Sequence, residues 1–230
     1  MTNIPLPLRR CAVALSLLAL GACASSPSAT VRSGPTPVTY QQGQDAAYAR
    51  AVADSIRHPY TEADIHFMSA MIGHHSQAIV MSRMAPTHGA SSNVQTLADR
   101  IINAQQDEIV TMQRWLRNRR QPVPDAKPGP MKMMMNGMEH EMLMPGMLTE
   151  DQMQALDQAR GEQFDRLFLT GMIQHHNGAV SMVHDLFGSY GAGQDETVFK
   201  FASDVNVDQT TEIARMERML NSFALEKGAQ

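Results

Sequence analysis

This chain of 230 residues contains few cysteines and few aromatic residues, and it has no surplus of positive charge. Its two cysteines, Cys11 and Cys23, are too few for the disulfide framework of a small secreted domain. Lysine and arginine number 19 against 23 aspartates and glutamates, so the chain lacks the basic footprint of a nucleic-acid-binding protein. We therefore expect no nucleic-acid partner.

Several common catalytic motifs are absent as well. The sequence has no Gly-x-x-x-x-Gly-Lys phosphate loop and no Gly-x-Ser-x-Gly turn of a serine hydrolase. It also lacks the Glu-x-x-His pairs of di-iron bundles and the Cys-x-x-Cys-His haem attachment site. These absences direct attention to what is abundant, namely 19 methionines and nine histidines.

The N-terminus carries a targeting pattern. Arg9 and Arg10 precede an apolar run that ends in Leu-Gly-Ala-Cys at residues 20–23, which resembles a bacterial lipoprotein signal. The run is short for a membrane-spanning helix, and a small buried helix is the alternative. We expect removal of residues 1–22 and lipidation of Cys23, which would anchor the protein to a membrane on the periplasmic side of the envelope, with the outer membrane as a candidate.

Lipidation of Cys23 would leave no free thiol in the mature chain. Any bound metal would then need His, Met, carboxylate or backbone ligands. Residues 23–44, rich in Ser, Pro, Thr and Gly, predict a flexible tether between the lipid and a folded domain over 45–225.

Helical signals dominate the rest of the chain. We predict helices over 44–57, from Thr61 to just before Pro86, over 92–119, over 149–187 with a division at Gly161 as an alternative, and over 195–225. Thr61 with Asp64, Ser92 with Gln95, and Thr149 with Gln152 have the spacing of capping boxes. Residues 120–148, with five prolines and three glycines, predict a linker.

The chain also repeats itself. Residues 64–81 align with 165–182 at an offset of 101, and both contain a His-His pair. A Gln-x-x-Glu-Ile-x-x-Met block follows in each half, beginning at Gln105 and Gln209. We therefore predict an all-α fold, a four-helix bundle made of two repeated helix pairs, with halves at 60–119 and 149–225 joined by the linker.

Potential metal ligands share faces of these helices. Asp64, Met71 and His75 lie on one face of their helix, and Glu108 and Met112 share a stripe of the next. Antiparallel pairing would let Asp64, Met71, His75 and Glu108 converge. In the second half it would do the same for Asp165, Met172, His176 and Glu212. In the alternative interpretation the methionines fill the core and the histidines are hydrogen-bonded core residues.

The linker offers softer ligands. It contains eight methionines within residues 131–147, a density with little use in packing. Thioethers favour Cu(I) and, by the same logic, Ag(I). An apolar lid over the bundle is the alternative. The linker residues predicted as a secondary soft-metal site are Met133, Met134, Met135, Met138, His140, Met142, Met144 and Met147.

The blocks at 67–78 and 164–179, with the two Gln-x-x-Glu-Ile-x-x-Met blocks, resemble the bacterial family called domain of unknown function 305 (DUF305). The resemblance spans about residues 60–222. It implies a ferritin-like fold and, because the exported CopM-type members bind copper, a role in copper tolerance. The matching metal-ligand candidates are Asp64, Met71, His74, His75, Met81, Glu108 and Met112, then Asp165, Met172, His175, His176, Met182, Glu212 and Met216.

We thus predict an envelope lipoprotein that binds copper, with Cu(I) favoured, or silver, for metal buffering or tolerance rather than catalysis. Two alternatives stay open: a structural envelope protein with a Met-rich core, and a metal-dependent oxidase. The expected partners are metal ions and, through the lipid, the membrane. A delivery partner and the oligomeric state are not indicated by the sequence.

Overall fold

The computed structural model describes residues 40–57, 60–135 and 138–228. This part of the chain is predominantly helical, as predicted, with six helices and one small β-hairpin. The elements are α1 Tyr40–Arg57, α2 Glu62–Met84, α3 Ser92–Asn118, β1 Met131–Met135, β2 Met138–Met142, α4 Glu150–Gln158, α5 Glu162–Gly188 and α6 Glu196–Gly228.

Two of the three expected capping boxes form. Thr61 caps α2 reciprocally with Asp64, and Thr149 caps α4 reciprocally with Gln152. At α3 the cap is Ser91, one residue earlier than expected, and its side chain accepts a hydrogen bond from the Val94 amide. The helix starts are therefore set mainly by local hydrogen bonds that the sequence pattern identifies.

The helical structure is interrupted between α4 and α5 near Gly161, which adopts φ +57°. This left-handed conformation favours glycine and ends the continuous helix that the pattern over 149–187 also allowed. At the other end of the chain, α1 begins at Tyr40, so the last residues of the predicted tether are helical. Residues 1–22, Cys23 and most of the tether lie outside the described part.

The predicted linker contains a hairpin that we did not predict. Strands β1 and β2 pair antiparallel, with Met133 opposite His140 and Met135 opposite Met138. The overlooked sequence signal is Asn136-Gly137, because Asn-Gly favours two-residue hairpin connections. Cross-strand backbone hydrogen bonds thus replace the irregular structure expected from the prolines and glycines.

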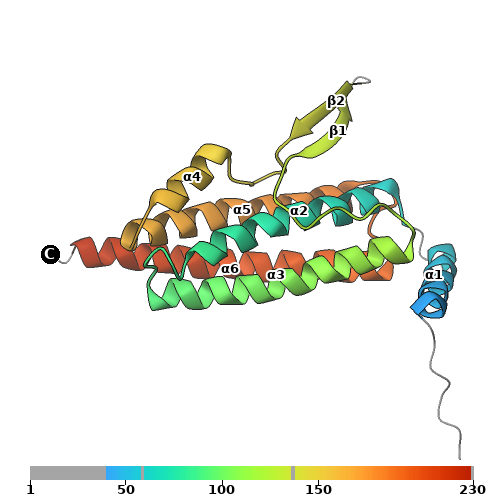
Figure 1. The fold of residues 1–230 in the computed structure, drawn as a ribbon, viewed down its shortest axis with the longest axis horizontal. Helices are drawn as coiled ribbons and strands as arrows, with labels where there is room; N and C mark the ends of the chain where they lie inside the picture. The colour runs from blue at the N-terminus through green and yellow to red at the C-terminus, as the bar shows by residue number, and fades with distance from the viewer. Residues whose placement is uncertain (1–39, 58–59, 136–137, 229–230) are drawn as a thin grey trace, which may run out of the picture. The chain divides into compact units, whose positions relative to one another are not determined.

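Four long helices run alongside one another, α2 with α3, α5 with α6, and α2 with α5 (Figure 1). The two helix pairs correspond to the two sequence repeats. Helix α4 lies against α5 and also contacts α2. Among the described residues, no helix has the length and apolarity needed to cross a membrane.

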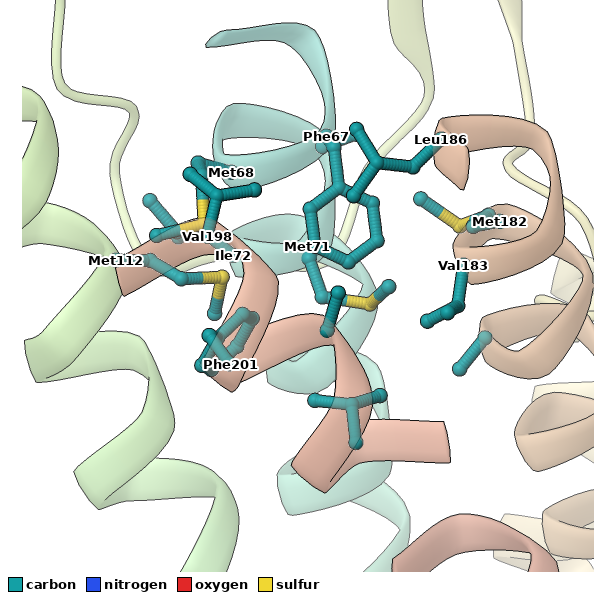
Figure 2. Packing of buried hydrophobic residues seen from close by; sticks show 14 of the residues in the cluster. Phe67, Met68, Met71, Ile72, Met112, Met182, Val183, Leu186, Val198 and Phe201 are labelled. Carbon is teal, nitrogen blue, oxygen red and sulfur yellow. The ribbon is translucent and has the colours of Figure 1, made fainter. Parts of the chain in front are cut away.

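Two apolar clusters hold the long helices together. The first includes Phe67 and Met71 of α2, Met112 of α3, Met182 of α5 and Phe201 of α6 (Figure 2). The second uses the later part of α2 and the earlier part of α5, so these two helices run antiparallel. Each cluster draws on all four long helices, which buries their apolar faces from water.

Candidate metal centre

A polar layer, which we call the histidine layer, lies between the two apolar clusters, apart from Ile79 of the first cluster, which follows it on α2. On α2 the pair His74 and His75 falls between Ile72, in the first cluster, and Ala78, in the second. The pair His175 and His176 of α5 falls likewise between Met172 and Ala179. On α3 and α6 the corresponding residues are Gln105 and Glu108, and Gln209 and Glu212. The sequence repeat therefore places its most polar residues at one level of the helical core.

Two of the histidines face carboxylates on the partner helix. His176 Nε2 lies 2.8 Å from Glu212 Oε2 in a hydrogen bond. His75 Nε2 lies 2.7 Å from Glu108 Oε2, with the oxygen off the direction of a good N–H hydrogen bond. Both histidines are fully buried, and both glutamates are partly exposed. The structure thus brings together His and Glu in each half, as the helical spacing suggested.

The other two histidines contact each other across α2 and α5. The His74 and His175 rings have centroids 3.8 Å apart, and both side chains are fully buried. His74 Nε2 lies 2.9 Å from the Pro145 carbonyl oxygen, and His175 Nε2 lies 2.9 Å from the His74 carbonyl oxygen. The first helices of the two repeats therefore meet at this pair.

These contacts select one tautomer. A carbonyl oxygen can only accept, so Nε2 of His74 and of His175 must donate its hydrogen. The carboxylate of Glu212 selects the same form of His176. In all four histidines Nδ1 is buried without a hydrogen-bond partner. Four imidazoles thus present an unpaired Nδ1 in the core, and a carboxylate or carbonyl on the opposite nitrogen is the usual arrangement behind a metal-ligating histidine.

Burial keeps the central pair neutral. Burial, reinforced by the neighbouring His75, lowers the pKa of His74 to about 3. Burial and the nearby His74 also lower the pKa of His175 well below 6.5. A neutral imidazole is the form that binds metal, so at neutral pH these two side chains need lose no proton to do so.

We expect these pKa values to make stability depend on pH. The unfolded chain binds protons at both histidines below about pH 6.5, whereas folded His74 stays neutral down to about pH 3. Their contribution is complete above pH 6.5 and is lost as the pH falls toward 3, by up to about tenfold in the unfolding equilibrium constant per pH unit for each histidine. Urea denaturation at several pH values measures this slope. The slope should be shallower in the double variant H74Q/H175Q, and an unchanged slope would contradict the assignment.

Two glutamines belong to the same layer and were not among the predicted site residues. Gln105 and Gln209 are buried, and the side-chain oxygen of each has no hydrogen-bond partner. Leaving a buried carbonyl oxygen unpaired is costly unless something else satisfies it. Their place at the start of each Gln-x-x-Glu block was the available sequence signal.

The predicted methionine ligands lie above and below the histidine layer. Met71, Met112 and Met182 belong to the first cluster, and Met81, Met172 and Met216 to the second. All six are buried and packed against apolar neighbours. Their thioethers therefore act as core side chains that flank the imidazoles on both sides.

Asp64 and Asp165 do not converge with the histidines. Asp64 accepts hydrogen bonds from Thr61 and from the Gly193 amide, at 2.7 Å, in the α5–α6 connection. Asp165 accepts from the Ser91 amide at the start of α3. The expected meeting of Asp64 with His75 was wrong, because eleven residues of helix separate them by about 16 Å. Asp64 therefore binds the connection between α5 and α6, and Asp165 binds the connection between α2 and α3.

We expect Asp64→Ala to destabilise the fold without changing metal binding. The variant loses the bonds that the carboxylate accepts from the Thr61 amide and hydroxyl, which are half of the α2 capping box, and leaves the Gly193 amide unpaired, a combined cost of about 1–3 kcal/mol. Urea denaturation and a silver titration of the same samples test both halves of the statement. A loss of bound metal from a folded variant would return Asp64 to the list of ligands.

The linker candidates divide into exposed and buried residues. Met138 and Met142 are exposed, whereas Met144 and Met147 are buried in the first cluster. The side chains of Met133, Met134, Met135 and His140 lie outside the described part. The second end of the linker therefore packs on the long helices, as the lid alternative expects, while Met138 and Met142 face solvent.

Residues 144–148, which we call the strap, run past the histidine layer. Gln77 of α2 bonds both the amide and the carbonyl of Leu148, and Gln174 of α5 donates to the Gly146 carbonyl. A Cβ added to Gly178 would lie only 1.9 Å from the Pro145 carbonyl oxygen. Glycine at 178 therefore allows the strap to reach His74.

An acidic groove lies on the outer side of Glu108. It encloses about 590 Å³ and is also lined by Asp107, Asp204 and Asp208. Burial raises the pKa of Asp208, and the nearby Glu108 and Asp204 add to the effect. Negative charge thus accumulates beside the carboxylate that contacts His75.

The donor set decides what the layer can bind. Within the described ranges, no group of three or more His, Cys, Asp or Glu side chains is arranged to hold a metal ion. Zn(II) commonly takes four such ligands. One ion in the layer would therefore be held by at most two of these side chains, alone or with thioether or amide oxygen, and imidazole with thioether suits copper in its reduced state.

Comparison with known proteins bears on this arrangement. The family described as domain of unknown function DUF305 matches residues 64–220, which cover most of both helix pairs and the whole histidine layer. The chain belongs to the DUF305 family. No curated protein matches the chain.

Solved structures of DUF305 proteins are similar to this one. A fragment from Deinococcus radiodurans has 26% identity and a TM-score of 0.58, covering 71% of this chain and 98% of that chain. A protein from Streptomyces coelicolor has 26% identity and a TM-score of 0.58, covering 70% and 93%. CopM in its Cu(II)-bound form has 28% identity and a TM-score of 0.52, covering 70% and 97%. CopM was also solved in Cu(I)-bound, Ag-bound and apo forms.

Proposed function

We propose that this DUF305 protein binds Cu(I) or Ag(I) as cargo through the buried imidazoles of His74, His75, His175 and His176. The observation that carries the proposal is the four unpaired Nδ1 atoms, three of them in residues whose Nε2 is hydrogen-bonded to an oxygen. A buried acceptor without a partner is unfavourable in an apolar core, and a metal ion would satisfy it. We propose buffering or tolerance rather than catalysis.

The surrounding residues favour a soft monovalent ion. Thioethers from Met71 and Met112 lie on one side of the layer and those of Met81, Met172 and Met216 on the other. Sulfur ligands select Cu(I) over harder divalent ions. The similarity to CopM, solved with copper and with silver, supports the same choice. Glu108 and Glu212 would orient His75 and His176 rather than bind the ion.

Three further proposals complete the function. Lipidation of Cys23 after loss of residues 1–22 would hold the domain over 45–225 at the periplasmic side of the envelope; a similar protein from Streptomyces coelicolor is described as secreted. The exposed methionines of the linker over 120–148 would capture ions for the buried layer. The two helix pairs, 60–119 and 149–225, would form a ferritin-like four-helix bundle.

An anaerobic titration tests the binding proposal. Purified protein is titrated in parallel with Cu(I), Ag(I), Cu(II) and Zn(II) against a competing chelator, and bound metal is counted by mass spectrometry. We expect the tightest binding for Cu(I) and Ag(I), accompanied by a higher melting temperature because the ligand binds the folded state. Melting unaffected by any of the four ions would favour the structural alternative.

We expect Glu212→Gln to weaken metal binding about 10- to 100-fold. The neutral amide retains the size of the carboxylate but gives up its charge, so it holds the His176 N–H less strongly. Affinity for Ag(I) by competition titration measures the effect. Glu217→Gln, at an exposed position on the same helix, is the matched control and should bind as the wild type does. Equal affinities in the two variants would exclude an orienting role for Glu212.

A further inference from the structure

A second thioether-rich region lies at the surface, outside the histidine layer. A groove of about 660 Å³ runs between the start of α2, the end of α5 and the segment that leads into the strap. Its lining includes the thioethers of Met142, Met144 and Met182 and the imidazole of His66. Figure 2 shows Met182 and Leu186 of α5 beside Phe67 of α2 at this edge of the first cluster.

The groove is graded from solvent to core. Met142 is 48% exposed, whereas Met144 and Met182 are 7% and 8% exposed. His66 is exposed on the first turns of α2. Apolar side chains form most of the remaining wall, so an ion that entered would exchange water for sulfur and imidazole ligands.

The charges of the groove favour a cation. Glu62 and Asp185 line it, and no lysine or arginine does so among the described residues. Carboxylates alone would suit hard ions such as Ca²⁺ or Mg²⁺, which prefer many oxygen ligands. Three thioethers and an imidazole instead match a soft monovalent ion.

The groove also adjoins the histidine layer. Pro145 lines it, and the Pro145 carbonyl oxygen accepts the hydrogen bond from His74 Nε2 at 2.9 Å. Met144, the preceding residue, packs over Gly73, since its Cε atom would lie 3.3 Å from a Cβ added there. One turn of the strap thus borders both the groove and a fully buried imidazole.

We infer that this groove is a separate surface site for Cu(I) or Ag(I), with Met142, Met144, Met182 and His66 as its donors, through which the ion reaches the histidine layer. The inference rests on the proposed function, because it assigns the same cargo to a second site. It gives His66 a role that its counterpart in the second repeat, Leu167, does not have.

The test follows methionine methyl groups during a silver titration. The protein is labelled with ¹³C in the methionine methyl groups and ¹⁵N in the histidine rings, and Ag(I) is the probe. We expect the methyl signals of Met142, Met144 and Met182 to shift at the first additions, before the buried imidazole nitrogens do. The triple variant M142L/M144L/M182L keeps side-chain volume without sulfur and should bind one Ag(I) fewer and load the imidazoles more slowly.

Met68→Leu is the matched control, because Met68 is buried in the same cluster but does not line the groove. It should load as the wild type does. The inference is wrong, while the proposed function stands, if the methyl signals of Met142, Met144 and Met182 do not shift in the wild type and the imidazoles of the folded triple variant load at the wild-type rate. If the groove methyl signals shift but the imidazoles never respond, the surface site stands and the proposed histidine site fails.

Discussion

Replacing His74, His75, His175 and His176 together by glutamine is expected to lower the affinity for Cu(I) and Ag(I) by at least about 100-fold. Glutamine places an amide N–H near the position of Nε2, so donation to Pro145, to the His74 carbonyl and to Glu212 can persist. What the variant removes is the four Nδ1 lone pairs. Competition titration with a chelator measures the affinity, and circular dichroism verifies that the variant is helical.

His184→Gln is the matched control for this experiment. His184 lies on α5 with His175 and His176 but is exposed. The control should bind as tightly as the wild type. The single variant His176→Gln gives a second measurement if the fourfold variant does not fold, and it should weaken binding by itself. Wild-type affinity in a folded fourfold variant would show that the buried histidines are not ligands.

Gly178→Ala is expected to destabilise the protein by about 3 kcal/mol, despite the higher helix propensity of alanine. The added methyl group would lie 1.9 Å from the Pro145 carbonyl oxygen and 2.6 Å from Gly146 Cα. Backbone cannot yield as a flexible side chain does, so the strap must move away and the His74–Pro145 hydrogen bond is lost. Urea denaturation gives the change in the free energy of unfolding.

Gly188→Ala provides the comparison on the same helix. A Cβ at Gly188 would meet nothing within 4 Å, so this variant should be as stable as the wild type or slightly more stable. Displacement of the strap in Gly178→Ala should also open the histidine layer to solvent and speed the exchange of bound Ag(I). Equal stability of the two variants would contradict the close approach of the strap.

Most of the helical framework could be predicted because its signals are local. Thr61 with Asp64 and Thr149 with Gln152 are capping boxes that depend on residues three apart. The repeat predicted which helices pair, and the stripe of Glu108 on α3 predicted its contact with His75. These features follow from helix geometry, which the sequence periodicity records.

The features that could not be predicted depend on contacts distant in sequence. The strap reaches His74 only because Gly178 of α5, 33 residues after Pro145 in the sequence, leaves room for the Pro145 carbonyl. Asp64 looked like a ligand because it shares a helix face with His75, but the Gly193 amide from the opposite pair satisfies it. Sharing a helix face shows that two side chains point the same way, but it does not show that they are close along the helix axis. The sequence pattern therefore could not tell that Asp64 lies away from the histidine layer.

The most direct test of the account is a ¹⁵N NMR spectrum of the histidine rings with and without Ag(I). Silver has a spin-½ nucleus, so a bound nitrogen shows splitting as well as a shift. We predict that Nδ1 of the buried histidines shifts and splits, while the Nε2 nitrogens of His74, His175 and His176 keep their hydrogens and their oxygen partners. Silver bound to the protein with every buried Nδ1 signal unchanged would contradict the central claim.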